Sequence, residues 1–152
     1  MTLKIDWRAL EDAFAFLNED NGAYLDRKTG ELLHWSNPDV TGEEDDTAER
    51  VADEPDRYVA LEPVDSREAW RWMAEFAETT EEPLRGQLQV ALDGAGTFRR
   101  FKNVLGGHPE ALRRWFELRD EKMREYIERF VEALQLPVEN PAAWHTEGGE
   151  RR

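Results

Sequence analysis

The stretch "GAYLDRKTGELLHW", residues 22–35, decides the fold class. Apolar side chains lie on both sides of a polar centre, and Gly30 stands where a tight turn needs a residue that accepts positive φ. This pattern predicts two short antiparallel strands joined by a turn. A third strand is predicted over residues 57–63, "RYVALEP", because Pro63 cannot continue the hydrogen bonding of a sheet.

Helical periodicity surrounds these strands. Trp7, Leu10, Phe14 and Leu17 are spaced to share one face of a helix that follows Asp6 as its N-cap. After the third strand, apolar residues repeat at helical spacing in four further segments, which begin near residues 65, 80, 97 and 109. The sequence therefore predicts an α+β fold. It consists of a small three-stranded antiparallel sheet packed with about five helices, and the C-terminal half is all helical.

The chain is strongly acidic. It has 34 Asp and Glu against 20 Lys and Arg, which gives a net charge of −14. Residues 42–56 hold eight of these carboxylates and one arginine, and we predict that they form a mobile acidic loop within a single domain over residues 1–136. Residues 137–152 show no periodicity and are predicted to be a loose tail. The acidic balance disfavours binding of duplex nucleic acid, which usually needs a basic surface.

The composition also argues against several kinds of chemistry. The chain has no cysteine, which rules out disulfides and zinc–thiolate sites, and its three histidines lack metal-ligand spacing. We expect no metal, no cofactor and no catalytic residues that can be named from the sequence. No apolar run reaches the ~18 residues of a membrane span, and the chain start does not resemble a signal peptide. A cytoplasmic protein without a membrane partner is therefore expected.

The best candidate site is "LDGAGTFRRFKNVL", residues 92–105. A helix that starts near Thr97 exposes unpaired N–H groups and the positive end of its dipole, where cations are mildly unfavourable. Arginine guanidiniums beside such N–H groups have the chemistry to hold an anion. We predict an anion-binding site formed by Gly94, Gly96, Thr97, Arg99, Arg100 and Lys102. In the alternative, Arg99 and Arg100 pair with carboxylates of the same chain.

Aromatic residues flank this candidate site. Phe98 and Phe101 are predicted to face the core with Leu105, because the three residues share helical spacing. On the last predicted helix, Trp115 and Arg119 are four residues apart, close enough for a cation–π contact, and are candidates to support the site. In the alternative, Trp115 belongs to the core and the charges near it form an ordinary solvated helix flank.

Several stretches carry a resemblance to a known family. "ALDGAGTFRRFKNVL", followed by "RRWFELRDEKMREYIERFVEAL", resembles the signature of the bacterial uncharacterised protein family zero-one-five-eight. "AWRWMAEFAETT" and "YLDRKTGELL" are also similar to that family, so that the resemblance spans roughly residues 5–135. Thr97 and Asn103 stand where the family pattern has Ala and Asp. The family has no assigned activity, so the resemblance implies only positions to watch: Gly94, Gly96, Phe98, Arg99, Arg100, Phe101, Lys102, Trp115 and Arg119.

Two hypotheses of function follow. In the first, the protein is a small acidic binding or regulatory module, whose helix start over residues 94–102 engages an anionic group on a protein partner or a small ligand. In the second, it is an acidic inhibitor, similar in action to an antitoxin, whose acidic loop covers a basic surface of a partner. An enzyme ranks third, because no nucleophile or metal-binding set can be named.

Overall fold

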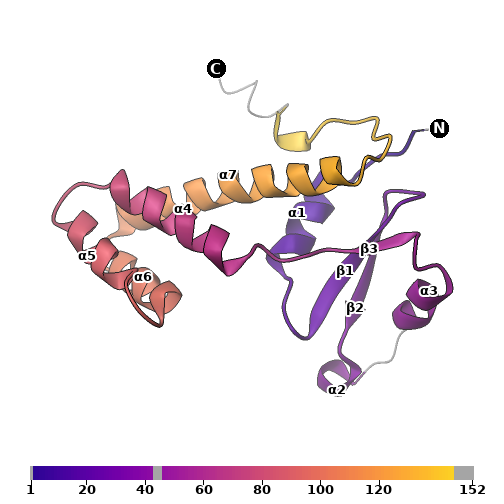
Figure 1. Ribbon diagram of the computed structural model, residues 1–152, viewed down its shortest axis with the longest axis horizontal. Helices are drawn as coiled ribbons and strands as arrows, with labels where there is room; N and C mark the ends of the chain where they lie inside the picture. Colours follow the sequence, from indigo (N-terminus) through magenta and orange to yellow (C-terminus); the bar gives the residue numbers. More distant parts are fainter. Residues whose placement is uncertain (1, 43–45, 146–152) are drawn as a thin grey trace. The chain divides into compact units, whose positions relative to one another are not determined.

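The structure, a computed structural model, describes residues 2–42 and 46–145. The sequence predicts one domain, whereas the chain groups into two compact units. Unit 1 comprises Met1–Pro63 and Ile127–Arg152, and unit 2 comprises Val64–Tyr126. In the part that the structure describes, the sheet belongs to unit 1 and unit 2 is built from helices (Figure 1).

The predicted hairpin forms the centre of unit 1. Strands β1 (Asn21–Asp26) and β2 (Leu32–Ser36) are antiparallel, and β3 (Tyr58–Ala60) pairs antiparallel with the other edge of β1, giving the order β2-β1-β3. Gly30 has a φ of +80° in the turn, as predicted. A short helix, α2 (Pro38–Thr41), follows β2. The predicted α+β class with a three-stranded antiparallel sheet is therefore confirmed.

Helix α1 (Trp7–Ala15) packs on β1 and supplies much of the core of unit 1. Asp6 caps the helix by accepting a hydrogen bond of 3.0 Å from a main-chain N–H in its first turn. Trp7, Leu10 and Phe14 of the predicted apolar stripe are buried, which confirms the helical period, whereas Leu17 lies beyond the end of the helix. The N-terminal pattern thus fixes both the start of the helix and its buried face.

The tail is packed as far as the described residues reach, which corrects the prediction of a loose segment. The Asn140 side chain accepts from the main-chain N–H of Ile5 at 2.9 Å and donates to its carbonyl oxygen at 2.7 Å. Trp144 is buried and meets Trp7 edge to face, with ring centres 5.6 Å apart. These partners are distant in sequence, so local periodicity carries no signal of them. Residues 146–152 lie outside the described part.

The acidic segment also differs from the prediction. Helix α3 (Thr47–Asp53) occupies the second half of residues 42–56, and residues 43–45 are not among those described. Thr47 is buried and donates from Oγ1 to the main-chain oxygen of His34 on β2 at 3.0 Å. This contact ties the start of α3 to the sheet. The prediction of a mobile acidic loop did not include this helix, because repulsion between exposed carboxylates does not prevent a short helix that has a buried anchor.

An ion pair between the buried Asp26 and the partly exposed Arg57 stands at the end of the hairpin. Asp26 accepts from Arg57 Nε at 3.0 Å and from its Nη2 at 2.7 Å, and Glu54 accepts from the same guanidinium at 2.9 Å. The hydrogen bonds from Arg57 lower the pKa of Asp26 to about 2, although burial acts in the opposite direction. The guanidinium of Arg57, which directly precedes β3, thus links the end of β1 to the end of the acidic segment.

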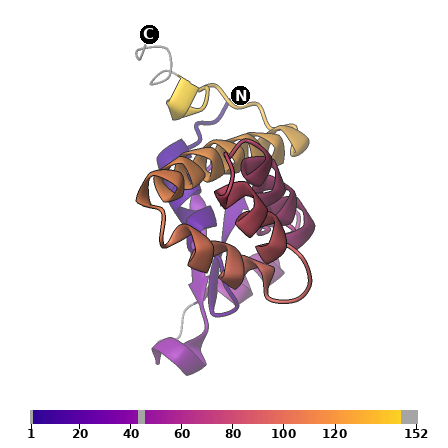
Figure 2. The same cartoon turned by 90° about the vertical axis from the view of Figure 1, so that its left-hand side faces the viewer.

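Unit 2 is helical, which confirms the predicted character of the C-terminal half. It contains α4 (Ser66–Glu78), α5 (Leu84–Ala91), α6 (Thr97–Leu105) and the first part of α7 (Pro109–Ala133). Helix α6 begins at the predicted residue, and α7 begins at the predicted proline. Figures 1 and 2 show α4 running beside the first part of α7, with α5 and α6 following in the chain.

Three aromatic rings form the centre of this unit. Phe76 of α4, Phe101 of α6 and Trp115 of α7 pack edge to face, with ring centres 5.1 to 6.3 Å apart. Phe101 and Leu105 are 0% exposed, which confirms them as core residues. Phe98 is 43% exposed, so the prediction that it faces the core is wrong. It stands in the first turn of α6, where the buried face gives way to an open pocket.

Candidate functional site

The start of α6 has the unpaired N–H groups that the sequence predicts. Gly96 is its N-cap, with a φ of +72° and no side-chain hydrogen bond to the helix, and no acidic residue stands in the first turn. The first main-chain N–H with a helical partner is that of Arg100, which donates to Gly96. The N–H groups of Thr97, Phe98 and Arg99 therefore have no acceptor within the helix, and the helix dipole is uncompensated there.

Arg100 points back to the preceding helix. Its Nη2 donates to the main-chain oxygen of Ala91 at 3.1 Å and also to that of Asp93. Gly94 has a φ of +81° in the same loop, and a Cβ on it would lie 3.7 Å from this Nη2. Arg100 thus binds carbonyl oxygens at the C-terminal end of α5, where cations are favourable. The sequence alternatives offered a ligand or a carboxylate, and the structure gives Arg100 a third partner, the main chain.

The other predicted site residues are dispersed. Arg99 and Lys102 are exposed and have no ion pair with any carboxylate that the structure describes. Trp115 is buried in the core, as the alternative predicts. Arg119 instead lies over the ring of Phe116, 4.9 Å from its centre.

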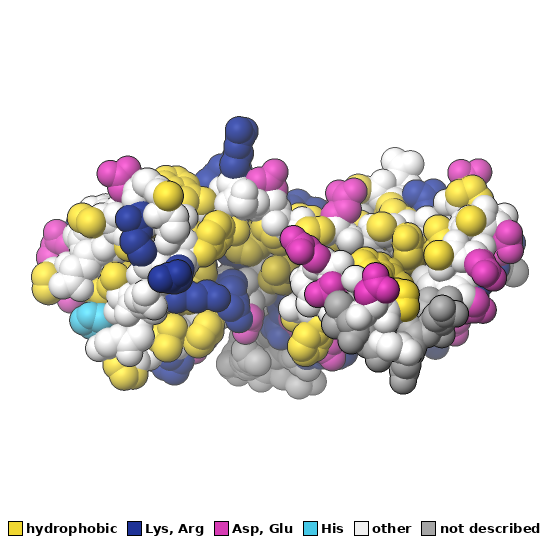
Figure 3. All heavy atoms as spheres, turned by 90° about the horizontal axis from the view of Figure 1, so that it is seen from below, with side chains coloured by type: hydrophobic (Ala, Val, Ile, Leu, Met, Phe, Trp, Pro, Cys, Tyr) yellow, Lys and Arg dark blue, Asp and Glu magenta, His cyan; other side chains and the backbone are white. Residues whose placement is uncertain are grey.

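A pocket of about 410 Å³ lies at the start of α6, entirely within unit 2. Its lining brings together the first two residues of α4 and the first two of α6, with one further turn of α4. These residues are Ser66, Arg67, Trp70, Arg71, Thr97 and Phe98. Figure 3 shows Lys and Arg side chains gathered beside hydrophobic ones on the left of that view, where Figure 1 places unit 2. Two helix N-termini therefore border one pocket. The start of α6 has no acidic residue in its first turn and is a site of positive potential, whereas Asp65 and Glu68 stand at the start of α4.

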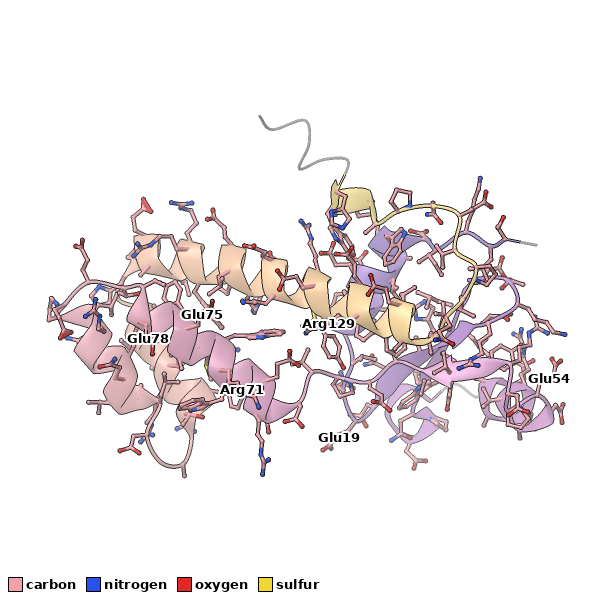
Figure 4. The ribbon with its side chains drawn as sticks, turned by 45° about the horizontal axis from the view of Figure 1, so that its top comes forward. Glu19, Glu54, Arg71, Glu75, Glu78 and Arg129 are labelled. Carbon is pink, nitrogen blue, oxygen red and sulfur yellow. The ribbon has the colours of Figure 1, made fainter. Side chains whose placement is uncertain are left out.

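No carboxylate that the structure describes forms an ion pair with the arginines of this pocket. Arg67 and Arg71 are exposed, and neither forms an ion pair within residues 2–42 or 46–145. They lie one turn apart on α4, where like charges repel by a few tenths of a kcal/mol. Glu75, the next residue along that face (Figure 4), pairs with Lys122 at 3.0 Å and raises the pKa of that lysine. Asp65 caps α4 by accepting from the main-chain N–H of Arg67.

Two aromatic side chains complete the pocket. Trp70 is 40% exposed, and its indole N–H donates to the main-chain oxygen of Leu92 at 3.0 Å, which fixes one edge of the ring. Phe98 is exposed to a similar extent on the facing helix start. An anionic group with a flat apolar group attached would find hydrogen-bond donors, positive charge and aromatic surface in one place.

The sequence contained a signal for this pocket that spacing could have revealed. In "SREAWRW", residues 66–72, Arg67, Trp70 and Arg71 fall at i, i+3 and i+4, so they share one face of a helix. Trp70 is not part of the core stripe that contains Trp72. Trp70 is an apolar residue outside the buried stripe, and it lies between two arginines in the first turns of a helix. This pattern indicates an exposed binding surface.

Other sites find less support in the described ranges. No group of three or more His, Asp and Glu side chains there is arranged to hold a metal ion. Arg113 on α7 is paired with Glu110 at 3.0 Å and with Glu117 at 2.6 Å. Because these carboxylates neutralise its charge, Arg113 does not extend a basic surface along α7. No helix of the described chain has the length and apolar composition needed to cross a membrane.

Comparison with known proteins agrees with the resemblance seen in the sequence. The model of the Uncharacterised protein family (UPF0158) matches residues 1–140. A UPF0158 protein of Pseudomonas aeruginosa is 31% identical over 133 residues, which cover 87% of this chain and 82% of the relative. No solved structure matches the chain. The name of the relative states no activity.

Proposed function

The chain belongs to the uncharacterised protein family UPF0158, and we propose that it is a binding module for a single anionic group. The group is a carboxylate or phosphate attached to a flat apolar moiety, and the pocket between the starts of α4 and α6 holds it. Two sources have this chemistry: a small ligand such as a mononucleotide, and an acidic segment of a partner protein that also carries an aromatic residue.

One observation carries the proposal. Arg67 and Arg71, which have no ion pair among the described residues, and two helix starts line the same pocket of about 410 Å³. Cations at a helix start and one turn apart are each mildly unfavourable for the free protein. An anion placed between them reverses both penalties, because it interacts favourably with each charge and with the uncompensated dipole of α6.

The residues predicted from the sequence take different parts in this proposal. The hydroxyl and N–H groups of Thr97 contact the anion directly, and Arg99 and Lys102 add positive charge from the exposed face of α6. Arg100, Gly94 and Gly96 shape the loop that sets the position of the helix start. Trp115 supports the core beneath α6.

The net charge decides which anions are suitable. Over tens of ångströms a charge of −14 repels a polyanion, although salt near 0.15 M screens this repulsion beyond ~8 Å. Within a few ångströms, the guanidiniums and N–H groups outweigh it for one charged group. The proposal therefore favours a single anionic group over duplex DNA.

A titration followed by NMR tests the proposal. The ¹⁵N-labelled protein receives inorganic phosphate, AMP, a short Asp- and Phe-containing peptide, or duplex DNA, each at 0.15 M salt. We expect saturable shifts of the amide signals of Thr97 and Phe98 and of the Trp70 indole. AMP and the peptide are the arms that distinguish the two sources. If none of the four probes moves these signals, the proposed function is wrong, and if duplex DNA binds most tightly, the argument from charge is wrong.

The acidic inhibitor remains a second proposal. It is supported by the exposed surface of α3, where Glu49 and Asp53 have no ion pair with any residue that the structure describes. Unneutralised carboxylates of this kind steer a basic partner toward unit 1. Binding of a basic protein that is lost on Glu49→Gln with Asp53→Asn would support this function in place of the first.

A further inference from the structure

Unit 1 has a pocket of its own, of about 570 Å³, and it does not depend on the anion pocket of unit 2. Its lining comes from β1, β2 and the starts of α2 and α3. The lining residues with the most distinctive chemistry are two aromatic residues, Tyr24 and Trp35, and one carboxylate, Glu19. Glu19 stands shortly before β1 (Figure 4).

The register of the hairpin places the two aromatic residues on one face of the sheet. Trp35 is opposite Gly22, and Tyr24 is opposite Leu33, so all four side-chain positions lie on the same side. Tyr24 and Trp35 are therefore diagonal neighbours across β1 and β2, within reach of one ligand. The alternate residues of β1, including Leu25, are on the other face, in the core.

Gly22 fixes the position of the indole. A Cβ on Gly22 would lie 2.7 Å from Trp35 Nε1 and 2.9 Å from two further ring atoms. The ring therefore rests close to the main chain of β1, and any larger residue at position 22 would displace it. Because one side of the indole is supported by β1, the remaining surface of the ring is held in place as part of the pocket wall.

The charge of the pocket is negative. Among the residues that the structure describes, its lining includes one carboxylate, Glu19, and no Lys, Arg or His. Glu19 forms no ion pair with the residues that the structure describes, and neither the Tyr24 hydroxyl nor the Trp35 N–H has a hydrogen bond there. The neighbouring Asp20 adds a further carboxylate, which accepts from Asn37 at 3.3 Å. A cation suits this surface, and an anion does not.

We propose that the pocket formed by Tyr24, Trp35 and Glu19 receives an arginine side chain from a basic segment of a partner protein. A guanidinium is planar and weakly hydrated, so it stacks on an aromatic ring while its N–H groups donate to a carboxylate. Glu19 provides the acceptor, and the two rings provide the stacking surface. Charge complementarity with a chain of net charge −14 favours a basic segment as the source of the arginine.

Peptide titrations test this inference with the full-length protein. The probe is a nine-residue peptide with a central arginine flanked by lysine and glycine, compared with the same peptide carrying glutamine at the centre. Calorimetry at 0.15 M salt measures affinity, and the Trp35 indole signal in ¹⁵N NMR reports the location. We expect the arginine peptide to bind at least fivefold more tightly and to shift the Trp35 signal. Equal affinity of the two peptides would overturn the proposal.

A matched pair of variants separates a specific site from general charge attraction. Glu19→Gln removes the pocket carboxylate, and Glu31→Gln removes an exposed carboxylate that does not line the pocket. Affinity for the arginine peptide should fall three- to tenfold in the first variant and less than twofold in the second. Equal losses would show that only net charge matters, and binding of a neutral aromatic compound with the same Trp35 shift would show that the pocket takes another class of ligand.

Discussion

The guanidinium of Arg100 donates a hydrogen bond of 3.1 Å to the main-chain oxygen of Ala91. One arginine of the adjacent pair thereby closes the end of α5, while its neighbour Arg99 is exposed and unpaired among the described residues. Two identical side chains at consecutive positions therefore have different tasks. Arg100 joins the first turn of α6 to the end of α5, and Arg99 leaves its charge at the surface.

Replacement of these two arginines should affect stability unequally. Arg100→Ala leaves carbonyl oxygens at the end of α5 without their donor, and it should lower the free energy of unfolding by about 1.5–3 kcal/mol. Arg99→Ala at an exposed position should change it by less than about 0.5 kcal/mol. Urea denaturation of both variants measures the difference. Equal effects would contradict the assigned task of Arg100.

The two phenylalanines of α6 should also differ. Phe101 is fully buried against Phe76 and Trp115, so Phe101→Ala should lower the free energy of unfolding by about 3–5 kcal/mol. Phe98→Ala removes a half-exposed ring and should lower it by no more than about 1 kcal/mol. Thermal and chemical unfolding of the two variants provide the comparison, and a large loss from Phe98→Ala would mean that its ring is a core residue after all.

The ion pair between Asp26 and Arg57 predicts a pH dependence. The pKa of Asp26 is lowered from 3.8 to about 2, so the folded state is stabilised above about pH 4 and this stabilisation is lost as the pH falls toward 2. Near neutral pH, Asp26→Asn should be less stable than the wild type by about 2 kcal/mol. The difference between the two proteins should shrink below pH 4. Asp12→Asn, at an exposed carboxylate, is the control, and a constant difference from pH 7 to pH 2.5 would argue against the ion pair.

Sequence periodicity predicted the elements that depend on neighbours in the chain. The hairpin around Gly30, the start of α6 at Thr97 and the start of α7 at Pro109 all follow from local steric and capping rules. The buried position of Phe101 also follows from its spacing. These features depend only on residues that are close in the sequence, so they can be predicted without the tertiary structure.

Features that depend on distant partners were not predictable in this way. The packing of the described part of the tail depends on Asn140, whose side chain accepts a hydrogen bond from the main-chain N–H of Ile5, 135 positions away in the chain. The pocket of unit 2 joins the starts of α4 and α6, about 30 residues apart, so the approach of α6 to Arg67 could not be predicted from the sequence of α4 alone. Arg100 was expected to use its charge on an anion, and the main-chain acceptors at the end of α5 became visible only with the loop geometry.

The affinity of charge-matched variants for one probe tests the central claim most directly. Arg67→Gln with Arg71→Gln removes two charges from the pocket, and Arg113→Gln with Arg114→Gln removes two from an exposed flank of α7. Calorimetry with AMP and with the acidic peptide, at constant salt, compares each double variant with the wild type. For whichever probe binds the wild type, our account predicts that the first variant binds at least about tenfold more weakly and the second within about twofold of the wild type. Equal weakening in both would contradict it, because the arginines would then act only through the net charge of the protein.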